Sequence, residues 1–162
     1  MSLIRAMYVS RPSGAGANDF DLTVAAILGV SRARNQMAGV TGALLASHDC
    51  FMQALEGTPG AVSAIMESIL RDPRHQAIRR FPDLTVDRLL FGDWSMYFGR
   101  LDEVDAPLAR AFSRDGTLDP FRMDQERVTA FLYACAVAPT PSTRSLRLDR
   151  LLESAPMVSR KH

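Results

Sequence analysis

Hydrophobic and polar positions in the first part of the chain alternate between strand-like and helix-like periods. The segment LIRAMYV at 3–9 is apolar on both faces, which is typical of a central strand covered on both sides. A Gly/Pro/Asn loop at 11–19 precedes a segment rich in alanine and glycine, and this pattern predicts a helix over 20–36. Two more strands are predicted at 39–46 and 50–56, joined by a tight turn.

The pattern then predicts a second helix, with Pro59 in its first turn and its end at Asp72. Its apolar residues repeat at i, i+3, i+4 and i+7, and the proline after Asp72 disfavours further helical geometry. Residues 77–89 predict a strand that Pro82 interrupts, and 94–99 predict one more short strand.

This order of elements predicts a fold of the α+β class. A β-α-β-β-α-β order with an extra strand is ferredoxin-like, and it places both helices on one face of one sheet. Helices that cover the other face are predicted at 104–113, 121–137 and 144–153. We therefore expect one domain over residues 2–100, a helical extension over 101–155 and a flexible tail over 156–162.

Composition and charge narrow the function classes. The chain has 162 residues, of which 47% are hydrophobic, so it can bury a substantial core. Its formal net charge of +1 creates no field that would favour nucleic acid or a membrane surface. The N-terminus does not resemble a signal peptide, the apolar run at 130–138 is too short to span a bilayer, and the two cysteines form no CxxC motif. We therefore expect a cytoplasmic protein with reduced thiols.

Two polar side chains are predicted to face inward on strands that would be neighbours in this fold. Tyr8 lies in the first strand, and Gln53 lies between Phe51 and Leu55 in CFMQALEG. A buried amide without partners costs on the order of 1–3 kcal/mol, so Gln53 must find both a donor and an acceptor. Tyr8 can supply one of them. The residues alone leave open whether this pair is a hydrogen bond within the core or part of a ligand site.

For the other candidate site residues, the sequence also leaves open whether their role is structural or functional. Asn35 suits the C-terminal cap of the first helix as well as a ligand contact. The basic segment RDPRH at 71–75 could bind a phosphate or complement the helix dipole. Trp94 and Met96 are predicted to share one face of the last strand, where they could simply fill the core. The three histidines lack metal-ligand spacing, and no GxSxG or Walker loop occurs, so we predict no metal site.

Together these motifs resemble the BLUF domain, the blue-light sensor using flavin. The resemblance covers about residues 2–100. It rests on Tyr8, on Asn35 in ARNQMAGVTGALL, on Gln53 in FMQALEG, on DPRH at 72–75 and on WSM at 94–96. It implies a non-covalent flavin between the two helices, usually FAD, with FMN as the alternative. The small residues of the first helix would make room for the planar ring.

The resemblance also implies a role for individual residues. Tyr8 would donate an electron and a proton to the light-excited flavin, and Gln53 would then rotate or tautomerise and strengthen a hydrogen bond to C4=O of the ring. Trp94 and Met96 would belong to the same switch. The residues expected to hold the flavin are Ile27, Asn35, Gln53, Ile69, Asp72, Arg74 and His75. This chain departs from the family at Ser68, where a basic residue is common, and at Arg34, where Asn or His is common.

The implied function is that of a short blue-light photoreceptor that is not an enzyme. It would signal through self-association into a homo-oligomer or through an unidentified downstream protein. One competing interpretation is a ferredoxin-like module that binds a small ligand or a protein without photochemistry. Another is an RNA-recognition module, which shares the order of elements but needs aromatic residues on an open sheet face and a basic surface.

Overall fold

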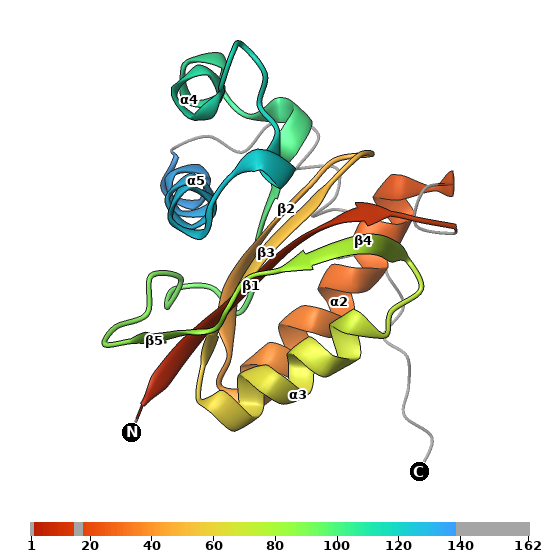
Figure 1. Cartoon of the computed structure of the whole chain (residues 1–162). Coiled ribbons are helices and arrows are strands. Elements are labelled where there is room, and N and C mark those ends of the chain that lie inside the picture. Colours follow the sequence, from red (N-terminus) through yellow and green to blue (C-terminus); the bar gives the residue numbers. More distant parts are fainter. Residues whose placement is uncertain (1, 15–17, 139–162) are drawn as a thin grey trace.

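Helices cover both faces of a single β-sheet (Figure 1). The structure is a computed structural model that describes residues 2–14 and 18–138. Helices α2 (Phe20–Ala38) and α3 (Pro59–Leu70) lie on one face, and α5 (Gln125–Val137) lies on the other with the short α4 (Ala106–Phe112) beside it. The helix predicted at 144–153 and the tail predicted at 156–162 lie outside the described residues.

The sheet has the order β4-β1-β3-β2-β6, and β5 also pairs with β1. Its strands are β1 (Leu3–Pro12), β2 (Thr41–Ala46), β3 (Phe51–Gly57), β4 (His75–Arg80), β5 (Leu84–Val86) and β6 (Tyr97–Arg100). The described strands pair antiparallel, apart from the parallel pair of β2 and β6. This arrangement confirms the ferredoxin-like α+β prediction, with β1 inside the sheet and an extra strand beside β2.

Local sequence signals fix the helix ends. The Asp19 side chain accepts a hydrogen bond from Leu22 N–H and so caps α2. At the other end Gly39 adopts the left-handed conformation, with φ 67°, that closes a helix. Helix α3 starts with a proline at its first position, and Asp124 caps α5 by accepting from Arg127 N–H.

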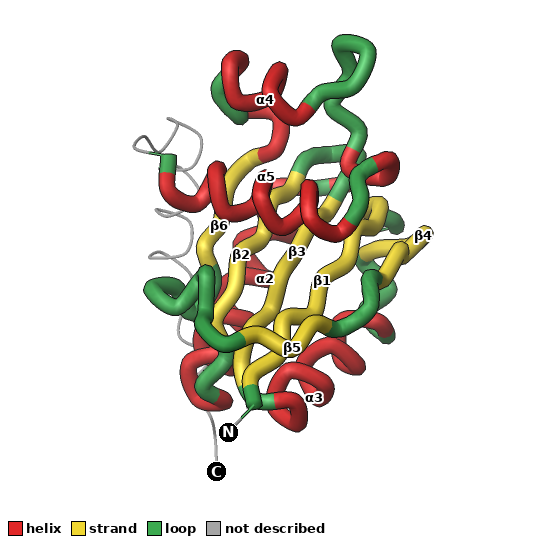
Figure 2. Tube along the Cα trace, turned by 60° about the vertical axis from the view of Figure 1, so that its left-hand side comes forward, coloured by secondary structure: helices red, strands yellow, loops and turns green. Residues whose placement is uncertain are grey.

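Two hydrophobic cores form, one on each face of the sheet. The first core lies under α2 and α3, and the second core lies under α5, which crosses the strands in Figure 2. Alternate residues of β1 enter different cores: Tyr8 lies in the first, whereas Met7 and Val9 lie in the second. Because α5 helps to form the second core, the predicted domain and its helical extension pack on the same sheet. The division at residue 100 stays a prediction.

Two strand predictions were wrong in detail. The region 77–89 forms β4 and then the short β5, separated by residues 81–83. Pro82 has no N–H for a strand ladder, and Ala77 adopts φ 51° where the pairing of β4 with β1 shifts register. The segment predicted as a strand at 94–99 begins to pair only at Tyr97. The residues before Tyr97 use their carbonyl groups to accept hydrogen bonds from side chains of α2.

The two described C-terminal helices are shorter than predicted. The first spans α4 rather than 104–113, because its N- and C-cap residues have extended or irregular backbone. The second begins at Gln125 rather than at 121, because residues 120–122 form a separate 3-10 turn before the Asp124 cap.

Candidate functional site

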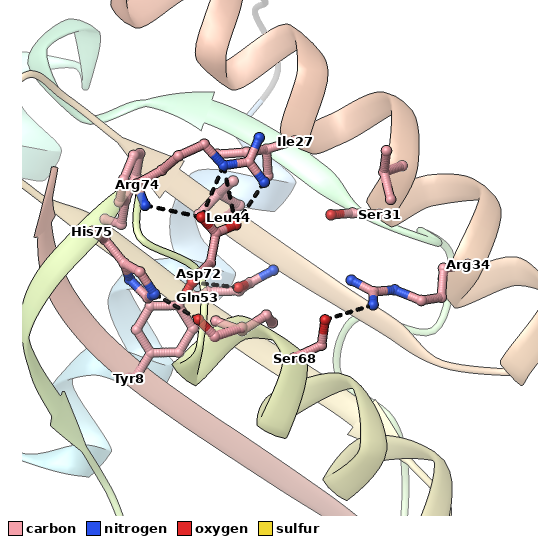
Figure 3. A pocket seen from close by; sticks show the side chains of 13 residues that line it. Tyr8, Ile27, Ser31, Arg34, Leu44, Gln53, Ser68, Asp72, Arg74 and His75 are labelled. Carbon is pink, nitrogen blue, oxygen red and sulfur yellow. Dashed lines mark hydrogen bonds and ion pairs between the residues drawn. The ribbon is translucent and has the colours of Figure 1, made fainter. Parts of the chain in front are cut away.

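A cavity of about 210 Å³ lies between α2, α3 and the sheet (Figure 3). Its lining combines apolar walls with a few polar groups from both helices, from the strands and from the loop after α3. The lining residues are Tyr8, Ile27, Val30, Ser31, Arg34, Leu44, Phe51, Gln53, Ser68, Ile69, Asp72, Arg74 and His75. Most of the predicted site residues therefore meet around one cavity.

The floor of the cavity carries the predicted pair of Tyr8 and Gln53. They lie directly opposite each other in the register of β1 and β3. Tyr8 Oη donates to Gln53 Oε1 at 2.6 Å, and Gln53 Nε2 lies 3.6 Å from Met96 Sδ, to which it donates. Burial, with a smaller effect from the nearby Asp72 carboxylate, raises the pKa of Tyr8 above its usual value. The phenol therefore stays protonated at neutral pH and fixes the orientation of the amide.

Met96 and Trp94 lie on opposite sides of the sheet, which corrects the prediction that they share a strand face. Met96 is buried in the first core beside Gln53, whereas Trp94 packs against the second core with its ring 5.7 Å from that of Tyr97. The strict alternation of a strand fails here because the residues precede β6. In this structure the methionine alone of the two contacts the amide.

Asn35 is fully buried but does not line the cavity. Its Nδ2 donates to the carbonyl oxygen of Ser95 at 2.8 Å, and its Oδ1 is buried without a hydrogen-bond partner among the described residues. The alternative that Asn35 caps α2 is wrong, because Gly39 fills that position. An unpaired buried acceptor costs free energy, so Oδ1 is an open position for a ligand donor.

Side chains of the DPRH segment form hydrogen bonds and a salt bridge with other groups of the protein. Arg74 forms a salt bridge of 2.6 Å with Asp72, and the hydrogen bonds from Arg74 hold the pKa of Asp72 below its usual value. His75 uses both ring nitrogens: Nε2 lies 2.7 Å from the Ile69 carbonyl oxygen, and Nδ1 lies 2.7 Å from Ser10 Oγ. Since a carbonyl can only accept, Nε2 carries a hydrogen. Asp72 therefore neutralises the charge of Arg74, and both ring nitrogens of His75 already have partners within the protein.

The two departures from the family pattern contact each other. Arg34 Nη1 donates to Ser68 Oγ at 2.9 Å, so the pair joins α2 to α3 at the cavity (Figure 3). The sequence pattern marked Arg34 only as a departure and did not single out Val30 and Ser31 as lining residues. Helical spacing is the signal that could have found them, because residues three and four positions after Ile27 lie on the same helix face.

The cavity fits part of a flavin. Its volume lies below the roughly 300–1,000 Å³ of sites that enclose a complete drug-sized ligand, so it suits a ring system whose remainder extends outward. Ile27 and Ile69 offer apolar walls from the two helices, and Asn35 Oδ1 offers an unpaired acceptor nearby. An adjoining shallow pocket is lined by Ser68, Arg71, Asp72, Pro73 and Arg74.

Comparison with known proteins agrees with this geometry. The family model BLUF, described as sensors of blue light using FAD, matches residues 3–97. This chain belongs to the BLUF family. Among solved structures, the photo-activated state of BlsA has a TM-score of 0.76 at 25% identity and covers 86% of this chain and 99% of its own. The dark-state structure of the BLUF protein BlrB has a TM-score of 0.69 at 29% identity, with 83% and 94% covered.

Sequence relatives include much longer proteins. A photoactivated adenylate cyclase subunit alpha-like protein FB from Euglena gracilis is 39% identical over 85 residues, which are 52% of this chain and 8% of that protein. The photoactivated adenylate cyclase subunit beta of the same organism is 31% identical over 75 residues, 46% of this chain and 9% of that protein. The match to this BLUF chain thus spans less than a tenth of these relatives.

The family assignment confirms the predicted class and cofactor: BLUF proteins are blue-light sensors that use FAD. The assignment of individual residues to the flavin stays a prediction. Within residues 2–14 and 18–138, no helix is long and apolar enough to cross a membrane. The same residues contain no group of three His, Cys, Asp or Glu side chains that could hold a metal ion.

Proposed function

We propose that this BLUF protein converts blue light into a reversal of the Gln53 amide at the floor of the cavity. The observation that carries the proposal is the hydrogen-bonded row from Tyr8 Oη through Gln53 to Met96 Sδ. The residues of this row are almost fully buried, so water does not compete for the amide. When bound, FAD supplies absorption of blue light and an excited state that accepts an electron and a proton.

The chemistry of the row explains why it can have two states. The hydroxyl of Tyr8 donates to the amide oxygen, and the amide nitrogen donates to a weak acceptor, the Met96 sulfur. If the phenol gives up its hydrogen, Oη can only accept, and the amide oxygen loses its donor. Reversal of the amide then turns its NH2 group toward Oη and its oxygen away from it. Return of the hydrogen to Tyr8 favours the first orientation again.

The flavin itself would be held by both helices. Ile27 on α2 and Ile69 on α3 would flank the ring system with apolar side chains, and Asn35 Oδ1 would accept a hydrogen bond. His75 would support the site without binding the flavin through its ring nitrogens, because Ser10 and Ile69 already bind both of them, and the charge of Arg74 is paired with Asp72. FMN would fill the same cavity, so the preference for FAD would depend on contacts outside it.

We further propose a cytoplasmic sensor that catalyses no reaction itself and signals through self-association or a downstream protein. The match to cyclases covers only the sensor portion of this chain, so their catalytic activity is not carried over. Exposed apolar side chains on and near α5, from Leu84, Tyr133 and Val137, support a contact surface there. Size-exclusion chromatography in the dark and after blue light tests for a change of assembly.

Lit-minus-dark absorption spectra test the amide switch. In Tyr8→Phe and Gln53→Leu, flavin should bind and the light-induced red shift should disappear. Gln53→Leu leaves the Tyr8 hydroxyl unpaired, which costs about 1–3 kcal/mol and should not unfold the protein. Tyr133→Phe and Gln76→Leu make the same changes at exposed positions and should keep the shift. A wild-type red shift in Gln53→Leu, at full flavin occupancy, would contradict the proposal.

A further inference from the structure

The segment that carries Met96 is held along its backbone by groups from outside the segment. Three successive carbonyl oxygens each accept one hydrogen bond: Trp94 O from Gly42 N–H at 3.1 Å, Ser95 O from Asn35 Nδ2 at 2.8 Å, and Met96 O from Arg32 Nε at 3.2 Å. Two of these donors are therefore α2 side chains spaced three residues apart, on one face of the helix. Side chains of α2 thus attach the segment to that helix.

Arg32 forms the charged and most accessible of these attachments. Its side chain is half-buried on α2, and its guanidinium reaches the carbonyl group of the residue whose sulfur accepts from Gln53. A charged donor makes a stronger hydrogen bond than a neutral one. A methionine side chain has three rotatable bonds, so the position of its sulfur depends on how firmly its backbone is held.

We propose that Arg32 is a positioning residue that sets how long the light-switched state lasts. It holds the Met96 backbone where the sulfur accepts from Gln53 Nε2, and it thereby favours the amide orientation seen here. The return to this orientation re-forms the contact between Nε2 and Sδ. A sulfur that is no longer held in place raises the barrier for that return. This inference rests on the amide switch proposed above.

Arg32 can be tested more cleanly than Asn35. Asn35 holds the same segment through Nδ2 but also carries the unpaired Oδ1, so its replacement would disturb the flavin and the segment together. Arg32 does not line the cavity. Arg32→Met keeps most of the aliphatic stem and removes every donor, while Arg32→Lys keeps a charged donor on a flexible stem. Arg110→Met makes the matched change on an exposed position of α4.

Two measurements on the flavin-loaded protein decide the proposal. The first is the methyl NMR resonance of Met96 in the dark, assigned with Met96→Leu, which reports the position of the side chain without light. The second is the rate at which the dark spectrum returns after a blue pulse. In Arg32→Met the resonance should move and the return should slow by roughly three- to tenfold, as expected when one such hydrogen bond is lost. The unfolding midpoint should fall by no more than the loss of this one hydrogen bond explains.

The control and rescue variants complete the test. Arg110→Met should match wild type in both measurements, and Arg32→Lys should restore most of the recovery rate. A wild-type resonance and rate in Arg32→Met would overturn the proposal, as would a faster return or a lysine variant no better than the methionine one. Failure of the amide switch itself would appear differently, as a light-induced shift that survives in Gln53→Leu.

Discussion

The sharpest stability prediction concerns Glu56, a fully buried carboxylate at the end of β3. One of its oxygens, Oε1, accepts from Arg5 Nε at 2.7 Å and from Leu90 N–H at 3.1 Å. The other, Oε2, accepts from Phe91 N–H at 2.8 Å. Glu56 therefore neutralises a nearly buried arginine and also ties the loop before β6 to the sheet.

The size of the effect follows from what a substitution leaves behind. Glu56→Gln keeps the volume and one acceptor, but it leaves the Arg5 charge buried at 7% exposure without a counter-ion. Breaking a buried ion pair from one side costs about 3–5 kcal/mol, because the remaining charge keeps its desolvation penalty. That is a large fraction of the roughly 5–15 kcal/mol that stabilises a typical domain. We expect a folded but strongly destabilised protein.

Urea unfolding measures this directly, through the midpoint at an unchanged slope. Glu67→Gln is the matched control, since Glu67 pairs with Arg71 on α3 while its side chain is 68% exposed. Glu67→Gln should lower the free energy of unfolding by less than about 1 kcal/mol. Adding Arg5→Met to Glu56→Gln removes the uncompensated charge and should recover part of the loss. A loss below about 1 kcal/mol in Glu56→Gln would refute the reasoning, because an uncompensated buried charge cannot be that cheap.

Two further predictions concern a close approach of the backbone at Gly42 and the ion pair of Asp72 and Arg74. A Cβ at Gly42 would lie 2.3 Å from the Ala54 carbonyl oxygen, so Gly42→Ala should abolish folding. The control, Gly60→Ala in α3, places its Cβ in open space. It should increase the free energy of unfolding by about 0.5–1 kcal/mol and so raise the urea midpoint. Hydrogen bonds from Arg74 lower the pKa of Asp72, so this pair stabilises the fold above the unfolded pKa of about 4 and stops doing so as pH falls through the lower folded value. Asp72→Asn should flatten the fall of the urea midpoint below that pH, and an unchanged acid dependence would contradict this assignment.

The hydrophobic periodicity of the sequence was sufficient to predict the order of helices and strands and the pairing of Tyr8 with Gln53. The alternation in β1 and β3 places Tyr8 and Gln53 on inward faces, and ferredoxin-like pairing makes those strands neighbours. The first fact follows from the local period of two and the second from the order of elements along the chain, so the amino-acid sequence was enough to expect that the two side chains could meet. The small residues of α2 gave a hint of the cavity, but the same pattern also suits plain helix-on-sheet packing.

The segment before β6 could not be predicted in the same way. Its conformation is set by tertiary partners: donors from α2 bind its carbonyl groups, and Glu56 binds the N–H groups of the preceding loop. Without a strand ladder, the period of two fails, so Trp94 and Met96 went to different cores. The sequence also left open whether the DPRH segment binds a phosphate, and it could not show that Arg74 turns back onto Asp72 only two residues away.

The same segment is also the place where the two cores meet. Met96 lies in the first core, and the next residue, Tyr97, lies against the second, where its hydroxyl donates to the Cys135 carbonyl oxygen on α5 at 3.1 Å. A change at Gln53 could reach the α5 face by shifting strands, which would break a row of ladder hydrogen bonds. Alternatively, it could move this segment, which gives up at most the three hydrogen bonds to the carbonyl groups of residues 94–96. The second route costs less free energy.

We therefore expect light to alter α5 more than the inner strands. Hydrogen exchange, followed by mass spectrometry in the dark and under blue light, should show a change at the C-terminal end of α5, where Tyr97 contacts Cys135. Exchange in β1 and β3 should stay the same in both states, because their ladder hydrogen bonds are kept. Tyr97→Phe removes only the hydroxyl that reaches α5, so the flavin spectrum should still shift while the change in α5 becomes smaller. An undiminished change in α5 in that variant would show that the signal travels by another path, through the strands themselves.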